Sequence, residues 1–250
     1  EINTMTTKFE NKVILITGGG TGIGKATAAA FIAEGANVVI TGRRQAVLEA
    51  ATQELGDSSH FVVGDISKDG DPKRIIAETI AKYGQLDILV NNAGTHTMGP
   101  LVETSDEEIE RTYRINVFGP LVLSREALPH LIKAKGSIIN ISSTVANGAI
   151  AGQSVYGSSK AAVDHATRTL AVEYGPSGVR VNAVAPGVTA TDMAGGALTD
   201  DTMMAMIIGQ TPLGRVGDPT DIAKAILLLA SDDAGWITGQ VVLASGGLMI

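Results

Sequence analysis

Residues 13–24 read Val-Ile-Leu-Ile-Thr-Gly-Gly-Gly-Thr-Gly-Ile-Gly, an apolar run that passes directly into a cluster of glycines. The run predicts a short buried strand over 13–17, followed by a helix that begins at Gly22. Gly18 permits a sharp turn, Gly22 a close backbone approach to a pyrophosphate, and Gly24 tight packing of helix on strand. Free N–H groups and a partial positive charge at the helix start favour a phosphate. The stretch predicts a dinucleotide-binding loop rather than a plain tight turn, although its glycine spacing differs from G-x-G-x-x-G. The expected cofactor contacts here are Gly18, Thr21, Gly22, Ile23 and Gly24.

The rest of the chain alternates short apolar runs with amphipathic segments. Strands that are apolar on both faces and separated by helices are typical of a parallel sheet covered on both sides. We predict a single α/β domain over 1–250, a doubly wound parallel sheet (Rossmann fold) of about seven strands, with ligands at the strands' carboxyl ends. Strands are predicted at 13–17, 37–41, 60–63, 86–90, 137–142, 179–184 and 240–243, and helices at 22–34, 44–55, 72–83, 105–115, 118–133, 155–174 and 222–229.

The segment 189–212 breaks this alternation. It is rich in Met, Gly and Ala and is longer than an ordinary connection. Long insertions in compact domains are usually lids or binding loops. We interpret the segment as a substrate-side lid, the alternative being a surface excursion without function.

Composition excludes several classes of function. A net charge of −7 argues against nucleic-acid binding. The chain has no cysteine and its four histidines lack metal-ligand spacing, so no metal site is expected. No apolar run is long and clean enough to span a bilayer. Residues 1–7 are polar without a signal-peptide core, and we interpret them as a disordered or tag-derived N-terminus. We expect a cytoplasmic protein that binds neither nucleic acid nor membrane.

Two arginines follow the second predicted strand. In dinucleotide-binding folds an acidic side chain at this place binds the adenosine ribose 2′-hydroxyl. Here Gly42 takes that place, followed by Arg43 and Arg44. A guanidinium pairs well with a 2′-phosphate, so the position favours NADP(H) over NAD(H). The alternative is two solvated arginines at a helix start. Asp65 and Ile66, after the third strand, are expected beside the adenine, unless Asp65 is simply a turn aspartate.

A tyrosine and a lysine lie four residues apart on one predicted helix. Tyr156 and Lys160 share a helix face, and Ser143 follows the fifth strand, whose carboxyl end should lie near that helix's start. The pKa of free tyrosine is about 10, which suits neutral-pH acid–base work poorly. An ammonium at about 4 Å would favour the phenolate by roughly 4 kcal/mol before desolvation at an effective dielectric near 20, so we expect a lowered pKa. A lone Tyr-x-x-x-Lys is usually structural, whereas the three residues together with the glycine loop predict acid–base chemistry.

At this point the chain resembles the classical short-chain dehydrogenase/reductase family, from about residue 12 to residue 247. Within this family, the sequence as a whole is similar to 3-oxoacyl-carrier-protein reductases. The resemblance implies NAD(P)-linked hydride transfer. It also implies a homotetramer formed through the long helices and the last helix–strand unit. The apolar run 226–230 and Trp236 are compatible with this assembly, but the run is equally compatible with a buried core helix. The shared pieces, in the family's order, are 17–24, Asp65, 91–94, Asn116, Ser143, Tyr156 with Lys160, and Pro186 with Gly187.

The resemblance also implies a role for each matched residue. Tyr156 would donate a proton to the carbonyl in reduction and remove it from the alcohol in oxidation, while Ser143 would hydrogen-bond the same oxygen. Lys160 would lower the tyrosine pKa and bind the nicotinamide ribose. Asn116 would hold a water in a proton relay to solvent, unless it only caps or bends a helix. The remaining implied cofactor contacts are Asn92, Ala93, Gly94, Pro186, Gly187, Thr189 and Thr191.

The substrate is less defined than the chemistry. Thr21 stands where many NADP-dependent members carry a basic residue, and Ser245 where aspartate is common. The stretch 174–177 lacks the arginine with which acyl-carrier reductases usually engage their carrier. Methionines in the lid suggest an adaptable apolar pocket, or simply packing. The expected substrate contacts are Ser143, Gln153, Tyr156, His96 and Met193, with a solvated loop histidine as the alternative for His96.

Three functions stay open. The main expectation is an NADP(H)-dependent oxidoreductase that acts on a ketone or secondary alcohol, with 3-oxoacyl compounds among the candidates. The first alternative is an NAD(P)-dependent polyol or sugar dehydrogenase. The second, of another class, is a non-catalytic dinucleotide-binding regulator, against which the intact glycine loop and Lys160 argue.

Overall fold

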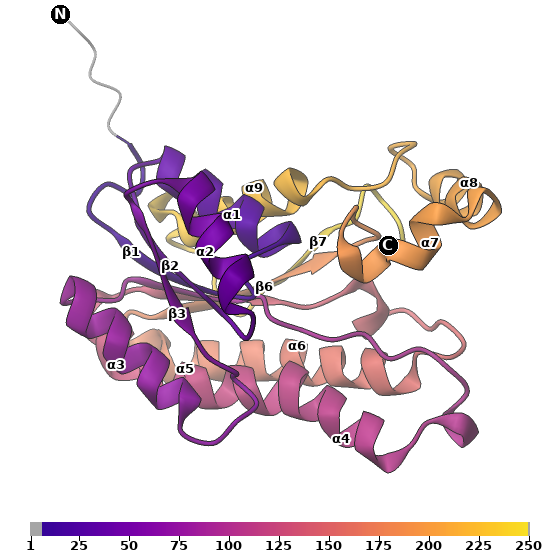
Figure 1. The fold of residues 1–250 in the computed structure, drawn as a ribbon, viewed down its shortest axis with the longest axis horizontal. Helices are drawn as coiled ribbons and strands as arrows, with labels where there is room; N and C mark the ends of the chain where they lie inside the picture. Colours follow the sequence, from indigo (N-terminus) through magenta and orange to yellow (C-terminus); the bar gives the residue numbers. More distant parts are fainter. Residues whose placement is uncertain (1–6, 250) are drawn as a thin grey trace, which may run out of the picture.

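The computed structural model describes residues 7–249, without the side chains of residues 196 and 197. The prediction for residues 1–7 therefore falls, apart from Thr7, outside the described residues. Within them, one parallel sheet runs in the order β3-β2-β1-β4-β5-β6-β7 (Figure 1). Its strands are β1 (Val13–Thr17), β2 (Asn37–Gly42), β3 (Ser59–Val63), β4 (Ile88–Asn91), β5 (Ser137–Ile141), β6 (Arg180–Pro186) and β7 (Val241–Ala244).

Helices cover both faces of this sheet, which confirms the predicted doubly wound fold (Figure 1). One layer contains α1 (Gly22–Ala33), α2 (Gln45–Leu55) and α9 (Pro219–Ala230), and the other contains α3 (Asp71–Tyr83), α5 (Gly119–Ala134) and α6 (Ser154–Tyr174). None of the helices in the described part of the chain is long and apolar enough to cross a membrane.

The continuous apolar strands follow from burial on both faces. In β1, Ile14 and Ile16 belong to the core under α1 and α9, whereas Leu15 belongs to the core under α3 and α5. Successive side chains of a strand point to opposite faces, so a strand between two helical layers needs apolar residues at every position. The run 226–230 in α9 has one buried face and one exposed face, since Ile226 and Leu229 are buried in the core while Leu228 is 58% exposed.

Two regions differ from the prediction. The two helices predicted at 105–115 and 118–133 form one uninterrupted helical segment. In it, α4 (Asp106–Tyr113) continues into α5 through a π-helical turn at Arg114–Phe118. The segment 189–212 contains two short helices that the prediction did not include, α7 (Gly195–Thr199) and α8 (Asp201–Gln210). The carboxylate of Asp200 starts α8 by accepting hydrogen bonds from two backbone N–H groups.

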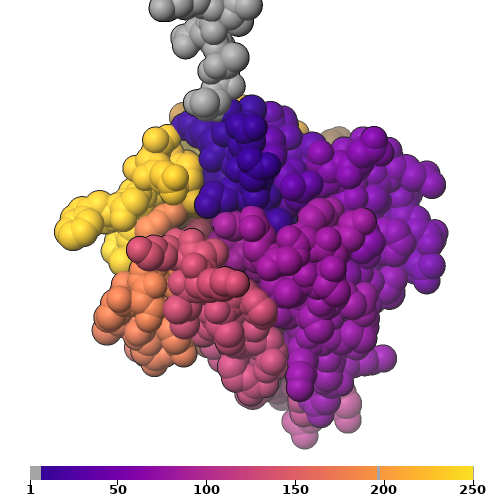
Figure 2. All heavy atoms as spheres, turned by 90° about the vertical axis from the view of Figure 1, so that its left-hand side faces the viewer, coloured from indigo at the N-terminus to yellow at the C-terminus, as the bar shows by residue number. Residues whose placement is uncertain are grey.

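The amino-terminal part of the described chain closes the end of the molecule opposite α7 and α8. Figure 2 shows this end, where the first residues (indigo) lie against the C-terminal part of the chain (yellow). Lys8 pairs with Asp233, and the ring of Phe9 packs edge-on against Phe31 with centroids 4.8 Å apart. The sites predicted from the sequence all lie toward the other end of the strands.

Candidate active site and cofactor site

The glycine loop joins β1 to α1 at the carboxyl edge of the sheet. Gly18 has a φ of +64°, which favours glycine, and its N–H donates to the carbonyl of Thr41 at 2.8 Å. A Cβ at Gly24 would lie 2.3 Å from the carbonyl oxygen of Gly18, so no larger residue fits without moving the loop. The Thr21 side chain makes no capping hydrogen bond, which leaves the first N–H groups of α1 for a ligand. The loop thus has the shape and donors that a pyrophosphate requires.

The end of β4 is tied to this loop through Thr17. The hydroxyl oxygen of Thr17 accepts hydrogen bonds from the N–H groups of Asn92 and Ala93 at 3.0 and 2.9 Å. The Asn92 side-chain amide in turn donates to the carbonyls of Thr17 and Gly18 at 2.8 and 3.2 Å. Two strands that are far apart in the sequence therefore hold the glycine loop in one shape. Thr17 was not among the predicted site residues, and its position directly before the glycines is the signal that could have indicated it.

The predicted adenosine side contains two exposed arginines and an aspartate that hydrogen-bonds within its own turn. Arg43 and Arg44 are exposed, and none of the ion pairs among the described residues uses either guanidinium. The carboxylate of Asp65 accepts from the N–H and the hydroxyl of Ser67 at 3.0 and 2.6 Å, as a turn aspartate does. The Ile66 side chain is buried in the core, so only its backbone remains for a ligand.

Tyr156, Ser143 and Lys160 converge where β5 ends and α6 begins. Tyr156 and Lys160 are 8% and 5% exposed, and Ser143 precedes the 3-10 turn that leads toward α6. The Lys160 ammonium donates to the carbonyl of Ile141 at 2.8 Å and lies 5.8 Å from the centroid of the Tyr156 ring. Strand β5 and helix α6 thus bring the three predicted residues into one site.

The electrostatics of this site correct one expectation. Burial raises the pKa of Tyr156, because it disfavours the charged phenolate, and hydrogen bonding by Ser143 only opposes that effect. A lowered pKa was expected, but Lys160 directs its ammonium to the Ile141 carbonyl. Burial lowers the pKa of Lys160 itself to about 8, against the opposing charge of Asp164. Burial and the contact of Lys160 with the Ile141 carbonyl thus both leave the phenol form of Tyr156 favoured in this structure.

Asn116 lies in the π-helical turn between α4 and α5. Its side-chain amide donates to the Thr95 carbonyl at 2.9 Å and to the Ser159 hydroxyl at 3.0 Å, while its oxygen accepts from the Thr95 N–H at 2.8 Å. A Cβ at Gly94 would lie 3.4 Å from that oxygen and 3.5 Å from the Lys160 ammonium nitrogen, so the three groups are neighbours. Asn116 thus links the π-helical turn to the loop after β4 and to α6, and Ser159 is a partner that the sequence analysis missed.

The segment after β6 borders the glycine loop. Pro186 ends β6, and the Thr189 hydroxyl donates to the Gly187 carbonyl at 3.0 Å. A Cβ at Gly22 would lie 3.1 Å from the Thr191 methyl carbon, so this segment touches the start of α1. Gly22 and Thr191 are among the residues that line a solvent-open cleft between the two segments. Thr191, predicted for the nicotinamide, thus lies against Gly22, predicted for the pyrophosphate.

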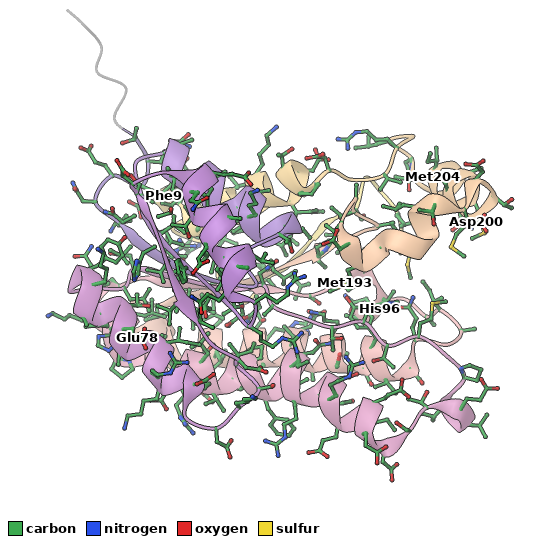
Figure 3. All side chains as sticks on the ribbon, viewed as in Figure 1. Phe9, Glu78, His96, Met193, Asp200 and Met204 are labelled. Carbon is green, nitrogen blue, oxygen red and sulfur yellow. The ribbon has the colours of Figure 1, made fainter. Side chains whose placement is uncertain are left out.

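Among the predicted substrate contacts, His96 lies directly against Tyr156. The His96 ring packs edge-on against the Tyr156 ring, with centroids 4.7 Å apart and an interplanar angle of 87°. The Gln153 amide oxygen is buried and makes no hydrogen bond within the part of the chain that the structure describes. Met193 is 53% exposed, and Figure 3 shows it on the same side of the molecule as His96.

Comparisons with known proteins agree with this geometry. A family model described as Enoyl-(Acyl carrier protein) reductase matches residues 18–249. The 3-oxoacyl-[acyl-carrier-protein] reductase of Thermotoga maritima is 37% identical over 248 residues, which cover 97% of this chain and 100% of that protein. The meso-2,3-butanediol dehydrogenase of Serratia marcescens is 35% identical over 96% of this chain and 95% of its own. A solved short-chain type dehydrogenase/reductase from Mycobacterium ulcerans superposes with a TM-score of 0.93 at 34% identity, over 97% of this chain and 91% of that one.

The chain belongs to the short-chain dehydrogenase/reductase family. It is an enzyme of the class that interconverts CH–OH and C=O groups with a nicotinamide dinucleotide, NAD(H) or NADP(H). The glycine cradle, the uncapped start of α1 and the buried Lys160 are features of this short-chain dehydrogenase/reductase that fit such a cofactor. The fold and the reaction class expected from the sequence are thereby confirmed.

Proposed function

We propose that this chain is an NADP(H)-dependent oxidoreductase that transfers hydride between nicotinamide and a ketone or secondary alcohol, with Tyr156 as general acid and base. The observation that carries this proposal is the convergence of Tyr156, Ser143 and Lys160 where β5 ends and α6 begins. A bound nicotinamide dinucleotide supplies the hydride in reduction and accepts it in oxidation.

Each polar group of the site has a defined part in the proposed reaction. Tyr156 gives its phenolic proton to the carbonyl oxygen as that oxygen gains charge, and takes it back from the alcohol in the reverse direction. Ser143 donates a hydrogen bond to the same oxygen, in the manner of an oxyanion hole. Lys160 keeps a positive charge next to the phenol and binds the nicotinamide ribose. Asn116 belongs to a water-mediated path along which the proton returns to Tyr156.

The cofactor preference rests on Arg43. With no acidic residue at the end of β2, an exposed guanidinium is available to a 2′-phosphate. The Arg43→Ala variant should bind NADPH about tenfold to a hundredfold more weakly, because charge-assisted hydrogen bonds contribute roughly 1.5–3 kcal/mol. Its NADH affinity should stay unchanged, since NADH has no 2′-phosphate. Tryptophan or cofactor fluorescence titration measures both constants, with Arg125→Ala as an exposed arginine control on α5. Equal affinities of the parent protein for NADPH and NADH would refute the preference.

The substrate is proposed to be a carbonyl compound with an apolar part. Exposed apolar side chains border this end of the molecule, including Met98 (62% exposed), Ile150 (43%) and Met193 (53%). The first two come from adjacent loops, which are joined by a hydrogen bond from the Gly99 N–H to the Gly152 carbonyl at 2.8 Å. The segment 189–212, with α7 and α8, is proposed as the lid over this opening. Adaptable methionines suit apolar substrates of varied shape.

A substrate panel tests the proposed function. Ketones, 3-oxoacyl thioesters, vicinal diols and sugars are offered with NADPH or NADP, and cofactor absorbance at 340 nm, a general property of reduced nicotinamide, is followed. We expect turnover with an apolar ketone and less with sugars. A chain that binds NADPH but turns over no member of the panel would instead support the non-catalytic regulator.

A homotetramer is the assembly proposed for this chain. Apolar side chains remain on the surface of the α5–α6 layer and beside β7, notably Phe118 (55% exposed), Val172 (78%) and Trp236 (100%). Figure 2 shows the C-terminal part of the chain (yellow) projecting from the body. Subunit contacts in the proposed tetramer would cover these side chains.

A further inference from the structure

Helix α6 contains a buried carboxylate that the proposed mechanism does not use. Asp164 is 2% exposed and follows Lys160 by four residues, so the two side chains lie on the same helix face. The polar side chains of Ser142 and Asn147 lie near its carboxylate, but neither carboxylate oxygen has a partner at full hydrogen-bond geometry among the described residues. A buried acidic group without such partners is costly, and its retention next to the proposed site points to a task in that site.

The seam between β5 and α6 places Asp164 beside the active lysine. Asn140 of β5 donates to the Thr167 hydroxyl of α6 at 2.9 Å, and Lys160 donates to the Ile141 carbonyl at 2.8 Å. Asp164 lies between these two contacts along the helix and faces Ser142, the next residue of the β5 chain. The Ser142 hydroxyl oxygen is also buried and unpaired among the described residues. The polar side chains between β5 and α6 thus form a row along the helix that ends at Lys160.

The charges around Asp164 come from its own helix. Lys160 lies one turn before it and Arg168 one turn after it, while β5 and the loop that follows contribute the uncharged Ser142 and Asn147. Arg168 is exposed, so solvent and salt screen its charge. Lys160 is buried, and the opposing charge that acts on it from the described residues is that of Asp164. Arg168 has the larger charge effect on the Asp164 carboxylate and Lys160 the smaller one. In the other direction, Asp164 is the charge that opposes the desolvation of Lys160, and a buried pair is screened less than an exposed one.

We propose that Asp164 is a positioning residue, whose buried carboxylate keeps the Lys160 ammonium charged and so keeps Tyr156 able to give up and regain its proton. This inference rests on the proposed function of Tyr156 and Lys160. Without Asp164, the desolvated lysine loses its proton more readily, and the phenol loses the neighbouring charge that favours its ionised form.

The pH dependence of carbonyl reduction gives the sign of the effect. Reduction requires Tyr156 protonated and Lys160 charged, so the rate falls as pH rises through the titration of this coupled pair. The pKa of Lys160 is about 8 with Asp164 in place. In the isosteric Asp164→Asn variant the alkaline limb of kcat/KM should move down by about one pH unit, the order expected for two charges one helical turn apart. Activity at pH 6 should be nearly retained, with about a tenfold loss on the limb itself.

A second readout follows Lys160 without turnover. Lysine labelled with 13C at the ε-carbon is titrated by NMR, and the Lys160 signal is assigned by its absence in Lys160→Arg. We expect the Lys160 midpoint to fall by about one pH unit in Asp164→Asn. Glu173→Gln, an exposed acid on the same helix, removes the same formal charge and should move neither readout. Should Asp164→Asn not fold, Asp164→Ser replaces it.

The outcomes separate the two hypotheses. An unshifted Lys160 midpoint and an unshifted alkaline limb in a folded variant would overturn the role of Asp164. A lower melting temperature with an unchanged Lys160 titration would assign Asp164 a structural role instead. If the parent protein reduces no carbonyl, the proposed function fails, and the NMR midpoint still decides whether Asp164 controls Lys160.

Discussion

Replacing Tyr156 with phenylalanine is expected to lower kcat by about a thousandfold, within the range for the loss of a general acid–base group. The ring and its edge-on contact with His96, at 4.7 Å between centroids, stay in place. Only the hydroxyl that carries the proton is lost. The NADPH dissociation constant should therefore change little, and stopped-flow absorbance at saturating substrate measures the fall in kcat.

The neighbouring Tyr113 provides a matched control. Its hydroxyl donates to Ser158 at 2.9 Å on the outer part of α6, so Tyr113→Phe removes the same group from a position without reacting atoms. We expect this variant to keep its turnover within about twofold, the scale of one exposed hydrogen bond. Turnover in Tyr156→Phe at the level of Tyr113→Phe would sink the assignment of the acid and base.

Replacing Gly24 with alanine is expected to weaken cofactor binding by about a hundredfold, the scale on which small misplacements act. The new Cβ would lie 2.3 Å from the Gly18 carbonyl oxygen and 2.6 Å from the Asn92 side-chain nitrogen. Both neighbours fix the glycine loop, so the loop must move. The backbone N–H groups at the start of α1 then no longer point at the bound phosphate. Crowding of this kind also costs about 1–3 kcal/mol of the free energy of unfolding. Calorimetric titration with NADPH and thermal unfolding measure the two effects.

Gly209 is the matched glycine. It lies in α8, and a Cβ there meets no atom of the described residues within 4 Å. The exchange to alanine also favours a helix. Gly209→Ala should leave the NADPH affinity unchanged. Its melting temperature should equal that of the parent protein or be slightly higher. Normal NADPH affinity in Gly24→Ala would show that the loop is not the phosphate site.

The sheet and its two helical layers were predictable from the sequence, because they depend on local patterns of apolar and polar residues. The run 13–24 combines an apolar strand with the glycines that a tight turn requires, and the seven strands alternate with amphipathic segments throughout. The convergence of Ser143 and Tyr156 was predictable as well, since parallel strands place their carboxyl ends at one edge.

Features that depend on packing were not predictable in the same way. The π-helical turn at Arg114–Phe118 has no distinct sequence pattern, and it arises where Asn116 bonds to Thr95 and Ser159 from other segments. The direction of the Tyr156 pKa shift depends on its burial and on where the Lys160 ammonium points, neither of which spacing reveals. Asp164 is one charged residue among many in the sequence, and only its burial against β5 makes it notable.

The fate of the hydride tests the central claim most directly. The purified protein reduces a ketone from the panel with NADPH deuterated at C4 of the nicotinamide, each face being labelled in turn. Mass spectrometry then measures the product alcohol. Direct transfer next to Tyr156 predicts one deuterium on the carbinol carbon from one labelled face only, and no such product from Tyr156→Phe on the same timescale. An alcohol without deuterium from either face, or one formed equally fast by Tyr156→Phe, would contradict hydride transfer with Tyr156 as the acid.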